Sequence, residues 1–129
     1  MSMLKGIHHI AIICSDYHKS KHFYTKVLGL EVLRETYREQ RNSYKLDLAL
    51  NARYTIELFS FPSPPERTSG PEACGLRHLA FEVEDVEAVV MRLNEAGIAT
   101  EPIRIDELTQ KKFTFFTDPD NLPLEIYEG

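Results

Sequence analysis

Two histidines and two glutamates recur at matching places in the two halves of the chain. His9 opens the segment His-Ile-Ala-Ile-Ile-Cys-Ser-Asp, and His78 opens His-Leu-Ala-Phe-Glu-Val-Glu-Asp 69 residues later. Glu57 lies within Tyr-Thr-Ile-Glu-Leu-Phe, and Glu125 lies within Leu-Pro-Leu-Glu-Ile-Tyr 68 residues later. Similarity at a nearly constant offset indicates that one structural unit occurs twice. These four side chains are therefore candidates for one shared site.

Two imidazoles and two carboxylates form a mixed nitrogen and oxygen ligand set. Such a set suits Zn, Ni, Co, Mn or Fe(II), whereas Mg and Ca prefer oxygen ligands and Cu(I) prefers thiolates. Four protein ligands on an octahedral ion leave two positions for water or substrate, as a catalytic metal requires. A single histidine in a strand is more often structural, and a single glutamate often lies on a solvated sheet face. Their repetition in register favours the hypothesis of one divalent metal site.

Each half of the sequence predicts the same order of elements. In the first half, a strand at residues 5–13 is followed by a helix that ends at Gly29 and by strands near 31–38, 43–50 and 54–61. In the second half, a strand at 76–83 is followed by a helix from Val86 to Ala96, a stop at Gly97 and strands near 99–105, 112–117 and 122–128. Both halves are therefore expected to form a βαβββ module.

Local signals support these boundaries. Ser15 or Asp16 can cap the first helix, and Gly29 supplies the left-handed residue that ends it. In segment 43–50, leucines alternate with Lys45, Asp47 and Ala49, the period of a strand with one buried and one wetter face. The turn at 118–122 contains Asn121, a residue type that tolerates positive φ.

Side-chain alternation predicts which face each candidate ligand occupies. His9 shares a face with Ala11 and Ile13, whereas Ile10 and Ile12 point toward the helix layer. Glu57 lies between Ile56 and Leu58, and the same reasoning places His78 and Glu125 opposite their apolar neighbours. His8 lacks a counterpart in the repeat, so we expect it to face away from His9. Two modules would thus offer one histidine and one glutamate each.

Other potentially reactive residues receive simpler interpretations. His18 and His22 stand four apart on the first predicted helix, a spacing that can bind zinc, but no glutamate follows His18 and both are expected to be exposed. Cys14 and Cys74 form no CxxC pair and are expected to be core or loop residues. Nothing in the sequence indicates a nucleophilic triad, a glycine-rich phosphate loop or a thiol catalyst.

Length and composition set the class of protein. The chain has 129 residues, 43% of them hydrophobic, and a net charge of −5 with acidic and basic residues interspersed. We expect one domain over 1–129, with module 1 at about 4–61, a proline-rich linker at 62–74 and module 2 at about 75–129. No basic stripe favours nucleic acid, and neither a membrane-spanning run nor a signal peptide is recognisable, which predicts a cytoplasmic protein without nucleic-acid or membrane partners.

The residues resemble the vicinal oxygen chelate superfamily, which includes glyoxalase I, the bleomycin-resistance proteins and extradiol dioxygenases. Ser20-Lys-His-Phe-Tyr-Thr-Lys-Val-Leu-Gly-Leu30 resembles the first helix of glyoxalase I, and Gly75-Leu-Arg-His-Leu-Ala-Phe81 resembles the start of its second module. Asp118-Pro-Asp120 through Leu-Glu-Ile126 resembles its last hairpin. The resemblance covers nearly the whole chain. It implies an α+β fold in which two βαβββ modules form a cupped mixed β-sheet.

Within this superfamily, the ligand order His, Glu, His, Glu is similar to that of glyoxalase I. The resemblance implies a lyase or isomerase that acts on a small oxygenated substrate, such as a 2-oxoaldehyde–thiol hemithioacetal, through a metal-stabilised enediolate. His9, Glu57, His78 and Glu125 would bind the ion, with Zn or Ni expected first and Co, Mn or Fe(II) as alternatives. By carry-over from the family motif, Glu125 is the candidate base, and Glu57 holds the ion or serves as base for the mirror-image substrate.

Some features depart from the glyoxalase pattern. The stretch after Glu57 does not match it, and Cys14 stands where isoleucine or valine is expected. Lys45, Asp47 and Arg77 are candidates for the pocket lining, although a solvated sheet face explains them equally well. An Fe(II) dioxygenase, an epimerase and a non-catalytic binding protein for a small molecule such as an antibiotic stay open as alternatives. The resemblance also implies a homodimer, with the ligands supplied by one chain or by two.

Overall fold

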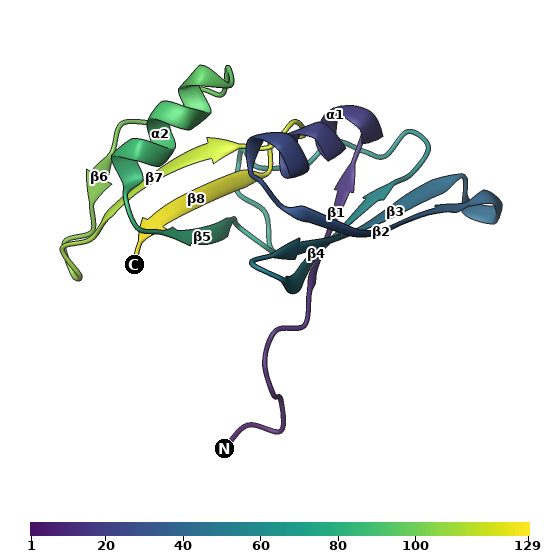
Figure 1. Ribbon diagram of the computed structural model, residues 1–129, viewed down its shortest axis with the longest axis horizontal. Helices are drawn as coiled ribbons and strands as arrows, with labels where there is room; N and C mark the ends of the chain where they lie inside the picture. Colours follow the sequence, from purple (N-terminus) through teal and green to yellow (C-terminus); the bar gives the residue numbers. More distant parts are fainter. The chain divides into compact units, whose positions relative to one another are not determined.

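The computed structural model describes residues 1–129, and the chain divides into two compact units, Met1–Pro65 and Glu66–Gly129. The boundary between the units falls inside the segment 62–74 that the sequence predicts as a linker. Each unit contains a four-stranded mixed sheet with a helix on one side (Figure 1).

The first unit builds its sheet in the order β1-β4-β3-β2. Strand β1 is parallel to β4, and the other neighbours are antiparallel. The helix between β1 and β2 begins as an α-helix and ends in a π-helical turn, and a short 3-10 turn precedes β3. In chain order the elements are β1 (Ile10–Cys14), α1 (Tyr17–His22), the π turn (Phe23–Val27), β2 (Glu31–Arg38), the 3-10 turn (Glu39–Arg41), β3 (Ser43–Leu50) and β4 (Arg53–Ser60).

The second unit repeats this topology with the strand order β5-β8-β7-β6. Strand β5 is parallel to β8, and β8, β7 and β6 follow as antiparallel neighbours. The predicted βαβββ modules and the α+β fold class are therefore confirmed. The elements are β5 (Leu79–Val83), α2 (Val86–Glu95), β6 (Arg104–Ile105), β7 (Lys112–Thr117) and β8 (Pro123–Glu128).

Strand register makes the internal repeat visible at single-residue level. Ala11 on β1 pairs with Glu57 on β4, and Ala80 on β5 pairs with Glu125 on β8. In each unit the paired alanine stands two residues after a candidate histidine. Because side chains two apart on an extended segment share a face, each histidine lies on the same side of its sheet as its glutamate.

Local chemistry fixes the helix ends where the sequence predicts them. The Asp16 carboxylate accepts a hydrogen bond from the Lys19 backbone N–H at 3.1 Å, and the Asp85 carboxylate accepts one from Ala88 at 3.0 Å. These are N-caps, which satisfy helix donors that lack an intrahelical partner. Gly29 has a φ of +83° just beyond the first helix. The predicted positive φ of Asn121 is also confirmed, at +66°.

Each unit buries its own apolar layer between helix and sheet. In the first unit, α1 packs against β4, and the fully buried side chains there are Tyr24, Leu46, Leu48, Ile56 and Leu58. In the second, α2 packs against β7 and β8, and the buried side chains include Val86, Leu93, Phe116, Leu124 and Ile126. The glutamates therefore point away from these cores, because their immediate neighbours along the strand point into them.

Three predicted strands begin at least three residues before the observed ones. β1 starts at Ile10 rather than at residue 5, and its first pair, Ile10 with Ile56, directly follows the bulge at Thr55 on β4. β5 starts at Leu79 rather than 76, since the position beside His78 is Pro123, which has no N–H. β6 is confined to Arg104–Ile105, and the rest of 99–105, which includes Pro102, is not a strand.

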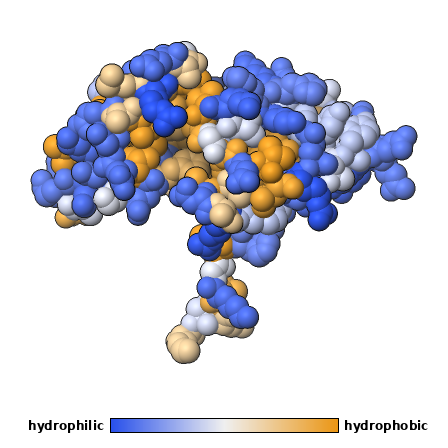
Figure 2. Space-filling view, in the orientation of Figure 1, coloured by the Kyte–Doolittle hydropathy of each residue, from blue (hydrophilic) through white to orange (hydrophobic).

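On the face that Figure 2 shows, hydrophilic residues, in blue, predominate, and hydrophobic residues, in orange, reach the surface in places. Exposed apolar side chains include Ile13 on β1 and Val32 and Leu33 on β2. No helix combines the length and the hydropathy needed to cross a membrane.

Candidate metal centre

The first unit brings His9 and Glu57 together. His9 immediately precedes β1 and Glu57 lies near the middle of β4, and the His9 Nε2 atom is 3.4 Å from the Glu57 carboxylate. The His9 side chain is about a third exposed, whereas that of Glu57 is nearly buried. The pair is thus open to a ligand on the histidine side and held in place on the carboxylate side.

The second unit forms the equivalent pair from His78 and Glu125. The His78 Nε2 atom lies 3.2 Å from the Glu125 carboxylate, and His78 directly precedes β5 as His9 precedes β1. The ring of His78 meets Phe115 edge-on at a centroid distance of 5.1 Å, which restrains its orientation. We call each His–Glu pair a half-site: His9 with Glu57, and His78 with Glu125.

The separation within each half-site suits two ligands of one ion. Charge-assisted hydrogen bonds between nitrogen and carboxylate are shorter, at about 2.7–2.9 Å. Ligand atoms at about 2.1 Å from a common ion stand about 3.0 Å apart at a right angle and about 3.4 Å apart at the tetrahedral angle. No group of three or more His, Cys, Asp or Glu side chains stands in metal-binding geometry in the structure, so each half-site supplies two candidate ligands.

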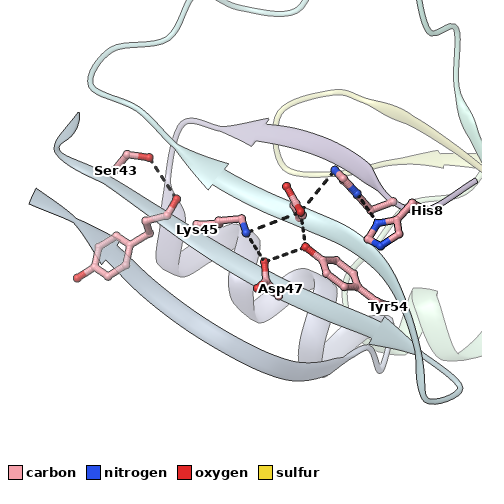
Figure 3. A network of polar contacts seen from close by, with 8 residues as sticks. His8, Ser43, Lys45, Asp47 and Tyr54 are labelled. Atoms are coloured by element: carbon pink, nitrogen blue, oxygen red, sulfur yellow. Dashed lines mark hydrogen bonds and ion pairs between the residues drawn. The ribbon is translucent and has the colours of Figure 1, made fainter. Parts of the chain in front are cut away.

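Further polar side chains surround Glu57. The single O–H of the Tyr54 phenol is shared between the carboxylates of Glu57 and, at 3.1 Å, Asp47. The ammonium group of Lys45 lies 3.3 Å from Asp47 and 3.7 Å from Glu57. Figure 3 shows Lys45, Asp47 and Tyr54 converging from β3 and β4. We call Lys45, Asp47 and Tyr54 the supporting network of Glu57.

A β-bulge brings Tyr54 onto the face of Glu57. The pairing of β3 with β4 passes from Leu48–Ile56 directly to Ala49–Tyr54, so Thr55 is an extra residue on β4. In a regular strand, residues three apart point to opposite faces, and the inserted residue restores them to one face. Strand alternation alone therefore assigns Tyr54 to the wrong side, and the sequence interpretation missed it. The placement of Tyr54 can be recognised only from the pairing of β3 with β4 and not from the β4 sequence alone.

The environment keeps the Tyr54 phenol protonated. Burial raises the pKa of Tyr54 well above its ordinary value, and the hydrogen bonds to Glu57 and Asp47 raise it further. The phenol therefore acts as a permanent hydrogen-bond donor to the two carboxylates at neutral pH. Of the three pocket candidates from the sequence, Lys45 and Asp47 belong to this network, whereas Arg77 pairs with Glu72 through bonds of 2.7 and 3.2 Å.

The prediction that His8 faces away from His9 is wrong. The Nδ1 atoms of the two imidazoles lie 2.8 Å apart, and the ring of His8 also contacts that of Tyr54 at a centroid distance of 5.4 Å. Strand alternation places His9 with Ala11 but does not extend to His8, which lies two residues before the start of β1. His8 is therefore a neighbour of the half-site (Figure 3).

The remaining candidates behave as the sequence predicts. His18 and His22 are both exposed on the first helix. Cys14 is buried in the core and Cys74 is exposed in a loop.

Glu125 differs from Glu57 in its contacts, since His78 is the sole hydrogen-bonding or ion-pairing partner of its carboxylate. The two half-sites thus share a His–Glu geometry and differ in the number of side chains that contact their carboxylates.

Comparisons with known proteins agree with this architecture. Residues 6–126 match the family described as Glyoxalase/Bleomycin resistance protein/Dioxygenase superfamily. The chain is 68% identical to the uncharacterized protein YwkD of Bacillus subtilis (strain 168), over 98% of both chains. It is 62% identical to the uncharacterized protein YaeR of Escherichia coli (strain K12), over 97% of both chains. Among solved structures, a glyoxalase family protein from Enterococcus faecalis is 53% identical with a TM-score of 0.90, over 98% of this chain and 100% of that one.

More distant relatives carry names that state an activity. The metallothiol transferase FosB of Staphylococcus epidermidis is 31% identical, over 98% of this chain and 86% of that protein. The solved structure of the fosfomycin resistance protein FosX from Listeria monocytogenes, complexed with Mn(II) and sulfate, has a TM-score of 0.75 at 22% identity, over 98% of this chain and 94% of that one. At that level of identity the likeness to FosX is one of fold.

Proposed function

The chain belongs to the Glyoxalase/Bleomycin resistance protein/Dioxygenase superfamily, and on that premise we propose that it is a metal-dependent lyase or isomerase of the glyoxalase I type. Its substrate is a small oxygenated molecule of the 2-oxoaldehyde–thiol hemithioacetal class. The observation that carries the proposal is the pair of equivalent half-sites, with His–Glu separations of 3.4 and 3.2 Å on matching strands of the two units.

The four ligands are His9, Glu57, His78 and Glu125, two imidazole nitrogens and two carboxylates around one divalent ion. This donor set fits Zn or Ni first, with Co, Mn and Fe(II) as alternatives. FosX, which shares the fold, is described with Mn(II). When bound, the ion supplies Lewis-acid chemistry, which polarises a substrate carbonyl and makes the adjacent C–H bond more acidic.

Glu125 is the base in this proposal, and Glu57 is the fixed ligand. A carboxylate that accepts a proton beside a dication must be able to shift, and Glu125 is held only by His78. Glu57 accepts a hydrogen bond from Tyr54 and faces the Lys45 ammonium at 3.7 Å, so a proton placed on it would weaken both contacts. Glu125 therefore takes the proton from one carbon and returns it to its neighbour, which completes an isomerisation without an external redox partner.

The protein is also proposed to be a homodimer. β2 is an edge strand of its sheet, and its side chains Val32 and Leu33 are 41% and 51% exposed. Uncovered edge strands with apolar side chains are favourable surfaces for association. Light scattering on the purified chain measures the mass, and a monomer at all concentrations contradicts this part of the proposal.

One experiment separates the proposal from its alternatives. Protein purified without an affinity tag is analysed for bound metal and then assayed with methylglyoxal and a panel of low-molecular-weight thiols, with oxygen uptake recorded in parallel. We expect about one divalent ion for every two half-sites. Thioester formation should stop when a chelator removes the metal. Oxygen consumption with a catechol instead indicates a dioxygenase, and tight small-molecule binding that needs no metal indicates a binding protein.

A further inference from the structure

A cavity in the second unit adjoins the His78 half-site. Its volume is about 340 Å³, within the range of small-molecule sites. The walls come from the segment after the unit boundary, from β6 and from the sheet, and they include His78 itself together with Phe115 and Pro123. A molecule in this cavity would therefore lie beside one of the proposed metal ligands.

Three arginines line this cavity, and two of them are already paired. Arg77 binds Glu72 at 2.7 Å, and Arg104 lies 3.2 Å from Glu101. Both of these carboxylates also line the cavity, so they neutralise the two guanidinium groups locally. The remaining arginine, Arg67, has no carboxylate partner. The cavity therefore carries one uncompensated positive charge, located on Arg67.

The guanidinium of Arg67 is held in place by neutral acceptors. Its Nε donates to the Ser69 hydroxyl at 2.8 Å, and its Nη2 donates to the backbone carbonyls of Leu76 at 2.7 Å and Arg77 at 3.1 Å. These contacts fix the plane of the group without cancelling its charge. They also leave both N–H groups of Nη1 available to a ligand. An anchored guanidinium loses little further side-chain entropy when it binds an oxyanion.

We propose that this cavity is an oxyanion subsite in which Arg67 binds a carboxylate or phosphate group of the substrate next to His78. Thr68 and Ser69 add hydroxyl groups to the cavity wall, whereas Phe115 supplies an apolar surface for the carbon skeleton. The substrate class is thus a small organic anion. The place of this subsite within a catalytic centre rests on the proposed function, but anion binding by Arg67 itself requires no metal.

The test measures anion binding on the metal-free protein. Inorganic phosphate and acetate are titrated into the chelator-treated chain and followed by calorimetry, with acetamide as the uncharged analogue of acetate. We expect saturable binding of at least one anion and no binding of acetamide. Arg67→Gln should lower the affinity for the anion by roughly tenfold or more. The matched control is Arg92→Gln, an exposed arginine on α2 outside the cavity, which should bind as the wild type does.

A second measurement on the wild-type chain covers the case in which Arg67→Gln fails to fold. The Nε–H resonance of Arg67 and the amides of Thr68 and Ser69 are followed by ¹⁵N–¹H NMR during the same titrations. Saturable shifts at these positions support the subsite, and the anion that saturates first identifies a phosphate-type or carboxylate-type substrate. The proposed subsite is overturned if neither anion binds, if Arg92→Gln lowers the anion affinity as much as Arg67→Gln does, or if the chemical-shift changes are confined to other residues. Metal analysis is independent of these readings, so failure of the metal proposal is recognised separately.

Discussion

The phenol of Tyr54 donates a hydrogen bond to the carboxylate of Glu57, three residues further along β4. The contact exists because the bulge at Thr55 turns both side chains to one face of the sheet. In the second unit, Glu125 has no comparable donor besides His78. The duplicated fold thus carries two equally buried carboxylates with different sets of contacts, and the proposed division into ligand and base is based on that difference.

Replacement of Tyr54 by phenylalanine should weaken the proposed metal site without unfolding the chain. The variant loses the donor to Glu57 and Asp47 and leaves Lys45 as their remaining neighbour in the supporting network. Loss of a partner that orients a metal ligand lowers affinity by about 10–100-fold. Competition with a chromophoric chelator measures the change.

The control for this variant is Tyr37→Phe, which removes an exposed hydroxyl that donates to Asn42 in the same unit. Its metal affinity should equal that of the wild type. Equal affinity in the Tyr54 and Tyr37 variants would show that Tyr54 does not position Glu57.

Glu125→Gln should abolish turnover while much of the metal stays bound. Glutamine keeps the shape of the side chain but cannot accept the substrate proton, and loss of a general base lowers rates by about 10²–10⁴-fold. Glu57→Gln should instead reduce metal content first, because Glu57 is the fixed ligand in the proposed site. Turnover and metal content are measured on the same preparations.

Glu95→Gln, on an exposed residue at the end of α2, is the matched control and should leave both quantities unchanged. Wild-type turnover in Glu125→Gln refutes the base assignment. Complete loss of metal in that variant would show that Glu125 is needed to hold the ion, and its loss of turnover would then give no support to a role as base.

Features set by neighbouring residues could be predicted from the sequence, and features set by a partner strand could not. The Asp16 cap, the Gly29 stop and the bounds of β2, β3 and β7 depend on local chemistry and alternation, and all were predicted. The start of β1 depends on its pairing with β4, and the position of His8 depends on that start. Tyr54 was missed because a bulge is visible only once β3 and β4 are paired. The anchoring of Arg67 likewise depends on carbonyls nine and ten residues away.

Leu48→Ala should destabilise the first unit strongly. Leu48 is fully buried on β3 between Val32 and Ile56 on the neighbouring strands. Truncation of a buried leucine removes transfer free energy and leaves a cavity, at a cost of about 2–5 kcal/mol in the free energy of unfolding. Urea denaturation measures it. Leu108→Ala, at a side chain that is 94% exposed, should change stability by less than about 0.5 kcal/mol. Similar values for both variants would contradict the assigned core.

The last prediction concerns pH and the Glu35 carboxylate on β2. Hydrogen bonds from Lys21 at 2.7 Å and from Tyr17 at 2.5 Å, together with the Lys21 charge, lower the pKa of Glu35 below its ordinary value. A group whose pKa is lower in the folded than in the unfolded state stabilises the fold above the unfolded value, which is about 4.3 for glutamate. That stabilisation is lost as the pH falls through the folded value. Because the side chain is 37% exposed, solvent screening limits the contribution to at most about 1 kcal/mol.

Glu35→Gln should therefore lower the free energy of unfolding at pH 7, and the difference from the wild type should shrink as the pH is taken from about 5 toward 3. Chemical denaturation across this pH range gives the difference directly. The matched control is Glu31→Gln, an exposed glutamate on the same strand that forms no ion pair, whose difference from the wild type should not change with pH in this way. A Glu35 difference that is the same at pH 7 and pH 3 would mean that the Lys21 and Tyr17 contacts do not hold the ionised carboxylate in solution.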